Sequence, residues 1–310
     1  MASAIKETCL SCFIGTFKQE FTMHNVTNLG IIGAGQMGGG IAQVAALSGF
    51  NVHLQDAFDG AIDACKASHG KRIARLVEKE RITQDDADAA LSQITYTANL
   101  DDLAGCDCVI EAIVEDAAIK ADLFERLAQM FTGNQILATN TSSISITQIG
   151  AAADKGSDGA AERVIGMHFF NPVPVMKLVE VINGLATTKD TTDRTLALAE
   201  AMGKTAVPAN DRAGFVSNRV LMPMINEAFY AWMEGVAEPA HIDDIMKLGM
   251  AHPMGPLRLA DFIGLDTCVH IMDVLADGLH SERYRACPLL QQLVTAGRLG
   301  NKTGRGVFEY

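Results

Sequence analysis

The sequence has no apolar run as long as the roughly 18 residues that a membrane-spanning helix needs. Basic residues are also scarce, because 25 lysines and arginines stand against 37 aspartates and glutamates, for a formal net charge of -12. So acidic a balance argues against general binding to nucleic acid or to an anionic membrane. We therefore expect a soluble globular protein with neither a nucleic-acid nor a membrane partner.

The sequence also lacks a regular set of paired cysteines. Its seven cysteines are odd in number and scattered, which favours reduced thiols and a cytoplasmic location. Cys9 and Cys12 form a CxxC pattern, but no second pair follows, so metal or redox chemistry is not favoured there. Residues 1–22 contain no arginine and two glutamates, a poor match to a mitochondrial transit peptide. We expect this extension to be disordered or to reflect a mis-assigned start.

The first half of the chain opens with a glycine motif between two periodic segments. An apolar strand is expected at 29–32, the sequence GAGQMG follows at 33–38, and helical spacing runs over 40–50. A second strand at 52–55 ends in Asp56, which lies 23 residues after Gly33, close to the ~20 typical of dinucleotide-binding units. A glycine pattern alone is weak, but this context predicts a dinucleotide site.

Each residue of this motif has a physical task. Gly33 makes the tight turn, Gly35 lets the backbone approach a pyrophosphate, and Gly38 lets the helix pack close to the strand. The amide groups that begin the helix offer hydrogen bonds and a positive dipole to the phosphates. Asp56 would accept from ribose hydroxyls and repel a 2′-phosphate, which predicts NAD rather than NADP as the cofactor. Two further residues at the helix start are expected to contact it, Gln36 and Met37.

Strands and helices continue to alternate after this unit. Residues 108–112 and 135–138 are continuous apolar strands, residues 117–130 are helical between them, and 163–167 adds another strand. Continuous apolar strands separated by helices are typical of a parallel sheet covered on both faces. We predict an α/β fold, a Rossmann-type doubly wound and mostly parallel sheet, over residues 23–208.

A basic stripe stands out in this acidic chain. Lys71, Arg75 and Lys79 recur at helical spacing between Asp56 and residue 83, with Arg72 beside them. The stripe is either a solvated helix face or a contact for a polyanionic substrate tail, such as coenzyme A with its phosphates.

The pattern becomes purely helical from residue 209 to 310. One apolar stripe of helical period runs from Val216 to Trp232, and further helices are expected at 241–250 and 257–279. So broad a stripe needs a partner. We expect an all-helical domain that binds substrate and forms a homodimer, with a purely intramolecular core as the alternative.

Two polar residues interrupt the apolar stretch 168–182. His168 follows an apolar strand, and Glu180 shares the face of a second strand with Met176, Leu178 and Ile182. A carboxylate on an apolar face is costly unless it is paired. The prolines of the intervening segment 171–174 predict a turn that brings Glu180 back to His168. The alternative is a core histidine and an unrelated carboxylate.

Six segments together resemble one family, the L-3-hydroxyacyl-CoA dehydrogenases, and most closely its bacterial 3-hydroxybutyryl-CoA dehydrogenases. The segments are GIIGAGQMGGGIAQVAALSGFNVHLQD, TNTSSISITQI, GMHFFNPVPVMKLVEVI, DRAGFVSNRVLMPMINEA, HPMGPLRLADFIGLD and KTGRGVFEY. They occur in the family's order, and the resemblance extends over residues 26–310.

The resemblance implies roles for named residues. His168 corresponds to the family's general acid/base, Glu180 to the residue that orients it, and Ser142 and Asn218 to contacts of the substrate's reacting oxygen. Further cofactor contacts carry over onto Asp56, Glu115, Lys120, Asn171 and Lys302. For coenzyme A, Lys79 matches a family lysine, whereas Arg72 stands where the family often has a serine, which puts that contact in doubt.

The implied reaction is NAD-dependent interconversion of (S)-3-hydroxyacyl-CoA and 3-oxoacyl-CoA, with 3-hydroxybutyryl-CoA as the expected substrate and no metal. A histidine with an ordinary pKa near 6.5 suits the removal of a hydroxyl proton at neutral pH. Two alternatives stay open: a dehydrogenase of the same scaffold that acts on L-gulonate or carnitine, and a non-catalytic NAD-binding protein.

Overall fold

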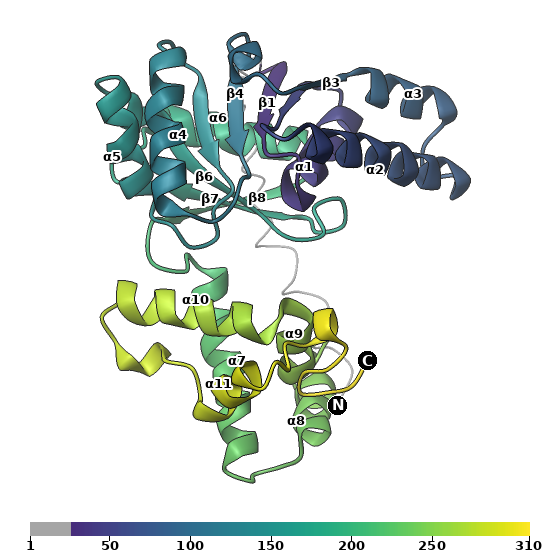
Figure 1. The fold of residues 1–310 in the computed structure, drawn as a ribbon, viewed down its shortest axis with the longest axis vertical. Helices are drawn as coiled ribbons and strands as arrows, with labels where there is room; N and C mark the ends of the chain where they lie inside the picture. Colours follow the sequence, from purple (N-terminus) through teal and green to yellow (C-terminus); the bar gives the residue numbers. More distant parts are fainter. Residues whose placement is uncertain (1–25) are drawn as a thin grey trace, which may run out of the picture.

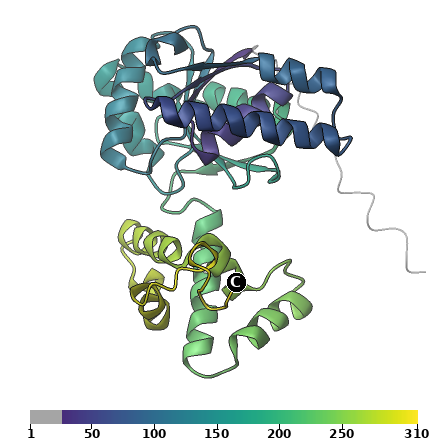
Figure 2. The same ribbon diagram turned by 45° about the vertical axis from the view of Figure 1, so that its right-hand side comes forward.

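The computed structural model describes residues 26–310, and the predicted extension 1–22 with its CxxC pattern lies outside the described residues. Figure 1 shows a sheet covered by helices above a separate group of helices. Figure 2, turned about the long axis, shows the same two bodies joined by the segment that leads into α7 (Ser217–Met233).

The described residues form one eight-stranded sheet with the order β3-β2-β1-β4-β5-β6-β7-β8. Pairing is parallel throughout except between β6 and β7. The strands are β1 (Asn28–Ile32), β2 (Asn51–Gln55), β3 (Ile94–Thr97), β4 (Cys108–Glu111), β5 (Ile136–Thr139), β6 (Val164–Phe169), β7 (Leu178–Asn183) and β8 (Thr205–Asn210). The predicted mostly parallel sheet is confirmed.

Helices cover both faces of this sheet, as the continuous apolar strands predict. Within β1, Leu29 and Ile31 belong to a core cluster that includes residues of α1 and α6, whereas Ile32 joins a second cluster with α4 and α5. The helices of this domain are α1 (Gln36–Leu47), α2 (Asp59–Glu78), α3 (Gln84–Ser92), α4 (Ala117–Met130), α5 (Ile146–Gly156) and α6 (Lys189–Ala201), with short 3-10 turns η1 (Leu100–Leu103) and η2 (Ala160–Arg163). Two buried layers on opposite faces make the sheet doubly wound.

The chain reverses between β6 and β7, as the prolines predict. The peptide bond between Asn171 and Pro172 is cis. In the antiparallel register that follows, His168 lies directly opposite Glu180. The β6–β7 turn (residues 170–177) includes Met176, so this residue lies outside the strand to which the alternation assigned it.

The second body contains only helices. They are α7 (Ser217–Met233), α8 (Pro239–Gly249), α9 (Pro256–Ile263), α10 (Leu265–Gly278) and α11 (Pro288–Thr295), with turns η3 (Glu282–Tyr284) and η4 (Asn301–Thr303). The helical pattern expected over 257–279 is broken at Gly264, whose φ of 104° separates α9 from α10. We propose that the division between the two domains lies near the interval between β8 and α7.

The apolar stripe of α7 is partly buried and partly exposed. Ile225, Ala228 and Phe229 are buried in the core of the helical body, whereas Val216 and Val220 are exposed. The alternative of a purely intramolecular core therefore accounts for only part of the stripe. Of the helices between residues 26 and 310, none has the length and apolar character needed to cross a membrane.

Candidate active site

The glycine motif forms a turn that fits a pyrophosphate. Gly33 has a φ of 103°, and a Cβ at Gly38 would overlap the Gly33 carbonyl oxygen, so both positions require glycine. A Cβ at Gly35 would meet nothing within 4 Å, which leaves open space above the backbone. No side chain caps the amino end of α1, and its first turn has no acidic residue. Free amides and open space together suit a bound phosphate.

Asp56 lies beside this turn at the carboxyl end of β2. Its carboxylate accepts hydrogen bonds from the Ala34 amide at 2.7 Å and from the Phe58 amide at 3.0 Å. The acid is therefore held at the edge of the glycine turn, where the ribose of a dinucleotide would lie. Two further predicted cofactor residues lie between Gly35 and Gly38. Met37 packs against the core, whereas the side-chain amide of Gln36 donates to Asn171 Oδ1 at 2.9 Å.

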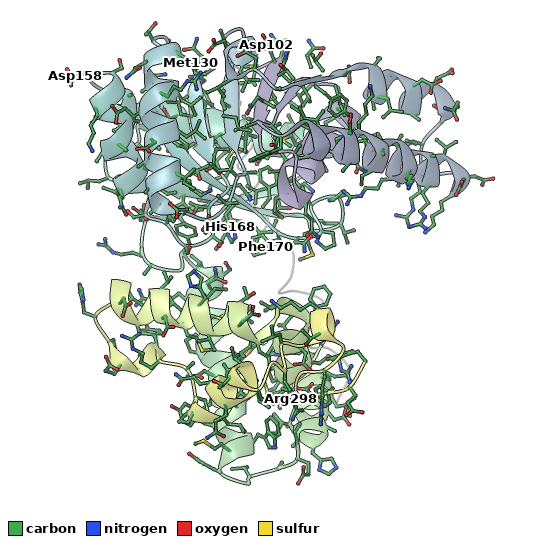
Figure 3. All side chains as sticks on the ribbon, in the orientation of Figure 1. Asp102, Met130, Asp158, His168, Phe170 and Arg298 are labelled. Carbon is green, nitrogen blue, oxygen red and sulfur yellow. The ribbon has the colours of Figure 1, made fainter. Side chains whose placement is uncertain are left out.

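His168 and Glu180 form a buried pair. His168 Nδ1 lies 2.8 Å from Glu180 Oε2, with the two residues 7% and 4% exposed. An ionised carboxylate only accepts hydrogen bonds, so Nδ1 carries the proton and Nε2 is left as the free ring nitrogen. Figure 3 places His168 and Phe170 at the edge of the sheet domain that faces the helical domain. The ring centroid of Phe170 lies 4.6 Å from that of His168.

The helical domain contributes directly to this pair. Ser217, the first residue of α7, donates its amide to Glu180 Oε1 at 3.0 Å and its hydroxyl to Oε2 at 2.8 Å. Burial raises the pKa of Glu180, but the hydrogen bonds from His168 and Ser217 outweigh it and leave this pKa below its usual value. Sequence reasoning missed Ser217, although it directly precedes the predicted Asn218.

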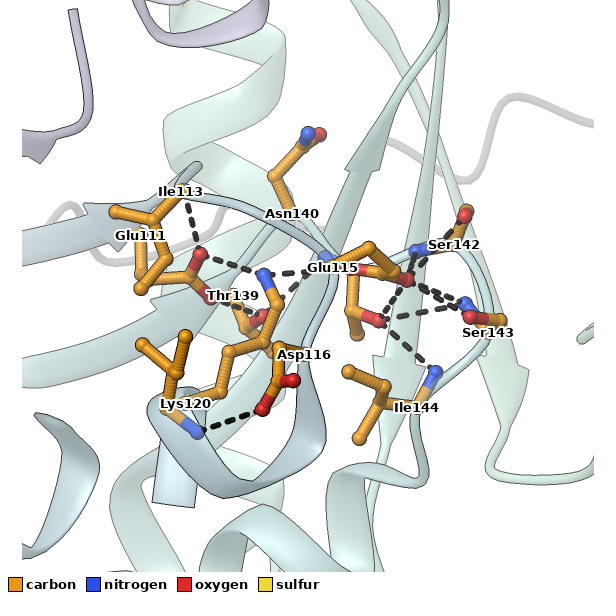
Figure 4. A network of polar contacts seen from close by, with 12 residues as sticks. Glu111, Ile113, Glu115, Asp116, Lys120, Thr139, Asn140, Ser142, Ser143 and Ile144 are labelled. Carbon is orange, nitrogen blue, oxygen red and sulfur yellow. Dashed lines mark hydrogen bonds and ion pairs between the residues drawn. The ribbon is translucent and has the colours of Figure 1, made fainter. Parts of the chain in front are cut away.

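Glu115 is the centre of a second polar network, which Figure 4 shows. Its Oε1 accepts hydrogen bonds from the Thr141 hydroxyl at 2.6 Å, the Ser142 amide at 2.9 Å and the Ser143 amide at 3.1 Å. Burial raises the pKa of Glu115, but the charge of Lys120 and these hydrogen bonds outweigh it and lower the pKa overall. The carboxylate therefore stays ionised and orders the loop that carries Ser142.

Lys120 is buried beneath this loop, with only 1% of its surface exposed. Its ammonium lies 2.6 Å from Glu111 Oε1 and 3.3 Å from Glu115 Oε2. Glu111 also accepts from the Thr139 hydroxyl at 2.7 Å. Sequence reasoning missed Glu111, yet a carboxylate within an otherwise apolar strand is the same signal that singled out Glu180.

The structure brings Ser142 and Asn218 together across the two domains. The Asn218 amide donates to the Ser142 carbonyl at 3.3 Å. Asn140, also missed, accepts from the Phe169 amide at 2.9 Å and so ties the serine loop to the end of the strand that carries His168. Residues from β5, β6, β7 and α7 therefore meet at one edge of the sheet.

Most of the basic stripe lines a cavity of about 420 Å³, although Lys71 is not among the lining residues. Arg72 and Lys79 lie in its wall with Arg75 and Arg81, opposite the β6–β7 turn. Gln36 and Asn171 also line it, so the basic cavity adjoins the glycine turn. This placement favours the functional interpretation of the stripe over a merely solvated face.

Lys302 is the predicted site residue that the structure leaves apart. It lies in η4 and forms an ion pair with Asp266 of α10 at 2.6 Å. Both residues belong to the helical domain. Within residues 26–310, no hydrogen bond or ion pair links Lys302 to the other predicted cofactor residues.

Two family models match consecutive parts of the chain. Residues 28–212 match the model described as 3-hydroxyacyl-CoA dehydrogenase, NAD binding domain, and residues 214–310 match 3-hydroxyacyl-CoA dehydrogenase, C-terminal domain. The chain belongs to the 3-hydroxyacyl-CoA dehydrogenase family. The predicted family and its NAD-dependent oxidoreductase class are thereby confirmed.

Individual relatives of this family agree. The chain is 53% identical over 280 residues to a probable 3-hydroxybutyryl-CoA dehydrogenase of Bacillus subtilis (strain 168), covering 90% of this chain and 96% of the relative. It is 54% identical over 281 residues to a protein of the same description from Deinococcus radiodurans, covering 91% and 99%. The crystal structure of (S)-3-hydroxybutyryl-CoA dehydrogenase from Ralstonia eutropha superposes with a TM-score of 0.88 at 45% identity, covering 92% of this chain and 99% of that one.

Proposed function

We propose that this protein interconverts (S)-3-hydroxyacyl-CoA and 3-oxoacyl-CoA, with 3-hydroxybutyryl-CoA as its substrate and His168 and Glu180 as its acid/base pair. The observation that carries the proposal is the buried His168–Glu180 hydrogen bond, which leaves Nε2 of His168 available. Asn218 directly follows Ser217, which binds Glu180, and its side-chain amide contacts the Ser142 carbonyl. The relatives named 3-hydroxybutyryl-CoA dehydrogenase support the choice of substrate.

His168 would move the proton of the reaction. In the oxidative direction, Nε2 would accept the hydroxyl proton of the substrate. NAD, held by the glycine turn and Asp56, would supply the acceptor for the hydride that leaves the carbon bearing that hydroxyl. Glu180 holds the ring in the tautomer that leaves Nε2 unprotonated and stabilises the imidazolium that forms, as an acid does behind histidine in a hydrolase triad. In the reductive direction, Nε2 returns the proton to the carbonyl oxygen.

Ser142 and Asn218 would hold the reacting oxygen. The Ser142 hydroxyl lies 3.3 Å from Glu115 Oε1, a long contact that it can exchange for the substrate. Asn218 comes from the helical domain and Ser142 from the sheet domain, so the oxygen site needs both. Donors fixed before the substrate arrives stabilise the developing charge without reorganisation.

The cofactor residues fall into two groups. Gly33, Gly35, Gly38 and Asp56 form the turn and its acidic neighbour, which fit the pyrophosphate and ribose of NAD as described above. A second group would act at the other end of the cofactor: Glu115 and Asn171 directly, and Lys120 by holding Glu115. The assignment of Lys302 rests on the family resemblance.

The basic cavity is the proposed site for the phosphates of coenzyme A. Arg72 and Lys79 supply charge from α2, and Arg72 can replace the serine that the family often has by offering a planar fork of donors. The cavity adjoins Asn171, three residues after His168. An acyl-CoA whose nucleotide binds there can extend its pantetheine arm, and the thioester at its end, toward the acid/base pair.

We also propose a homodimer formed through the helical domain. Large apolar side chains are exposed on α8, directly after α8, and on α9. They are Ile245, Leu248, Met250 and Phe262. Leu248 is the most exposed of them, with 84% of its surface accessible. Light scattering that gives about twice the chain mass of 33.1 kDa would support the dimer. The cytoplasmic location stays a prediction.

The decisive experiment is steady-state oxidation of NADH, and separately of NADPH, with acetoacetyl-CoA, comparing the unaltered protein with His168→Gln. Rapid turnover with NADH that collapses in the variant is the expected result. Turnover with NADPH alone would refute the role of Asp56. Binding of NADH without turnover would point first to another hydroxyl substrate, L-gulonate or carnitine, and then to a non-catalytic protein.

A further inference from the structure

Lys204 makes contacts that the proposed chemistry does not explain. Its ammonium donates to the Val173 carbonyl at 2.6 Å and to the Met176 carbonyl at 2.9 Å. Both acceptors belong to the β6–β7 turn, about 30 residues earlier in the chain, and neither is a carboxylate. Burial lowers the pKa of Lys204, in keeping with an ammonium that has exchanged water for carbonyl oxygens.

The local sequence fixes the backbone of this lysine. At the end of α6 the Gly203 amide donates to the Glu200 carbonyl at 2.9 Å and the Lys204 amide to the Ala199 carbonyl at 3.0 Å. These two bonds define a Schellman motif, which requires the left-handed conformation that Gly203 adopts at a φ of 71°. The helix terminus therefore sets the point from which the Lys204 side chain reaches the turn.

The turn is a part of the site that needs positioning. It joins His168 at one end to Glu180 at the other, and its residues 171–175 line the basic cavity. Asn171 receives the hydrogen bond from Gln36, and a Cβ at Gly40 of α1 would lie 2.9 Å from Val173 Cβ. A shift of this turn would therefore alter the coenzyme A cavity and the end of the glycine helix together.

We propose that Lys204 is a positioning residue that fixes the β6–β7 turn in the conformation that binds the acyl-CoA substrate. The turn has few internal hydrogen bonds, although Val173 packs in the core: the Pro172 carbonyl accepts from the Val175 and Met176 amides, and proline has no amide to donate. Lys204 supplies donors that the turn lacks. His168 depends instead on Glu180 and Ser217, so loss of Lys204 should affect substrate binding more than the proton transfer.

The test compares Lys204→Met and Lys204→Arg with Lys155→Met, which removes an exposed lysine from α5. With acetoacetyl-CoA and NADH, Lys204→Met should raise the KM for acetoacetyl-CoA about tenfold, equivalent to about 1.4 kcal/mol. Its kcat should stay within about threefold of the unaltered protein, since proton transfer uses other contacts. Lys204→Arg keeps charge and donors and should recover most of the loss. Lys155→Met should match the unaltered protein.

Hydrogen exchange provides the readout that is independent of turnover. In Lys204→Met the amides of residues 170–177 should exchange faster while the β6–β7 ladder keeps its protection. An unchanged KM together with unchanged amide exchange in residues 170–177 would overturn the proposal. An equal loss of protection throughout β6 and β7 would also overturn it, because that result would mark a general structural role. If Lys204→Met does not fold, Gly203→Ala keeps the lysine but strains its anchor and should show the same selective loss.

The kinetic part of this inference rests on the proposed function, and the two can fail separately. Absence of turnover in the unaltered protein would refute the proposed function, whereas hydrogen exchange would still decide whether Lys204 fixes the turn.

Discussion

Glu180→Gln changes one atom type at the centre of the proposed acid/base pair. In the structure this carboxylate accepts three hydrogen bonds, from His168 Nδ1 and from the amide and hydroxyl of Ser217. A glutamine offers a single acceptor oxygen, and its NH2 group can only donate. If the oxygen remains with Ser217, the NH2 group faces Nδ1 and the ring adopts the tautomer that is protonated at Nε2.

A histidine protonated at Nε2 cannot accept the proton of the substrate, and the charge that stabilises the imidazolium is also lost. We expect kcat to fall by about 10² to 10⁴, the range found for general acid/base contributions. The affinity for NADH should change little, because the glycine turn and Asp56 are elsewhere on the sheet edge. Steady-state kinetics together with fluorescence titration of NADH would measure both.

Glu227→Gln is the matched control, since it makes the same chemical change at an exposed position of α7. A kcat for Glu180→Gln within about threefold of that control would refute the orienting role. Stability gives a second readout. Because the pKa of Glu180 is held below its usual 4.5, its contribution is present above that pH and is lost as pH falls toward the folded-state pKa. Acid unfolding of Glu180→Gln should therefore depend less on pH in that window.

Three further predictions follow from the remaining contacts. Asp56→Asn removes the charge that repels a 2′-phosphate, so the preference for NADH over NADPH in kcat/KM should fall by roughly tenfold or more, and an unchanged ratio would contradict the assignment. Lys120→Met leaves Glu111 buried without its partner and should lower the free energy of unfolding by about 3–5 kcal/mol, measured by urea denaturation. The double variant Arg72→Ala/Lys79→Ala should raise the KM for acetoacetyl-CoA at low salt and have less effect at high salt. The same variant should leave turnover of acetoacetyl-pantetheine unchanged, because that substrate lacks the nucleotide phosphates.

Some parts of the site could be predicted because their determinants are local in sequence. The glycine turn is fixed by the positive φ of Gly33 and by the close approach of Gly38 to the Gly33 carbonyl, and Asp56 follows at the end of the next strand. His168 and Glu180 are separated by one short turn, so the prolines and the alternation predicted a reversal that brings them together, with a core histidine and an unrelated carboxylate as the alternative. Short-range geometry leaves few alternatives at such positions.

Other parts depended on contacts between distant segments. The family resemblance implied Lys120 as a cofactor contact, but its burial between Glu111 and Glu115 arises from the packing of α4 against the ends of β4 and β5. Ser217 reaches Glu180 only because α7 begins against β7.

The chain by itself therefore determined the fold class, the glycine turn and the pairing of His168 with Glu180, since each follows from periodicity, chain reversal or the cost of a buried charge. Tertiary structure alone decided how those parts are held. Buried polar groups must find partners wherever the packed elements provide them. Neither the contact of Lys204 with the β6–β7 turn nor that of Ser217 with Glu180 leaves a periodic signal in the sequence.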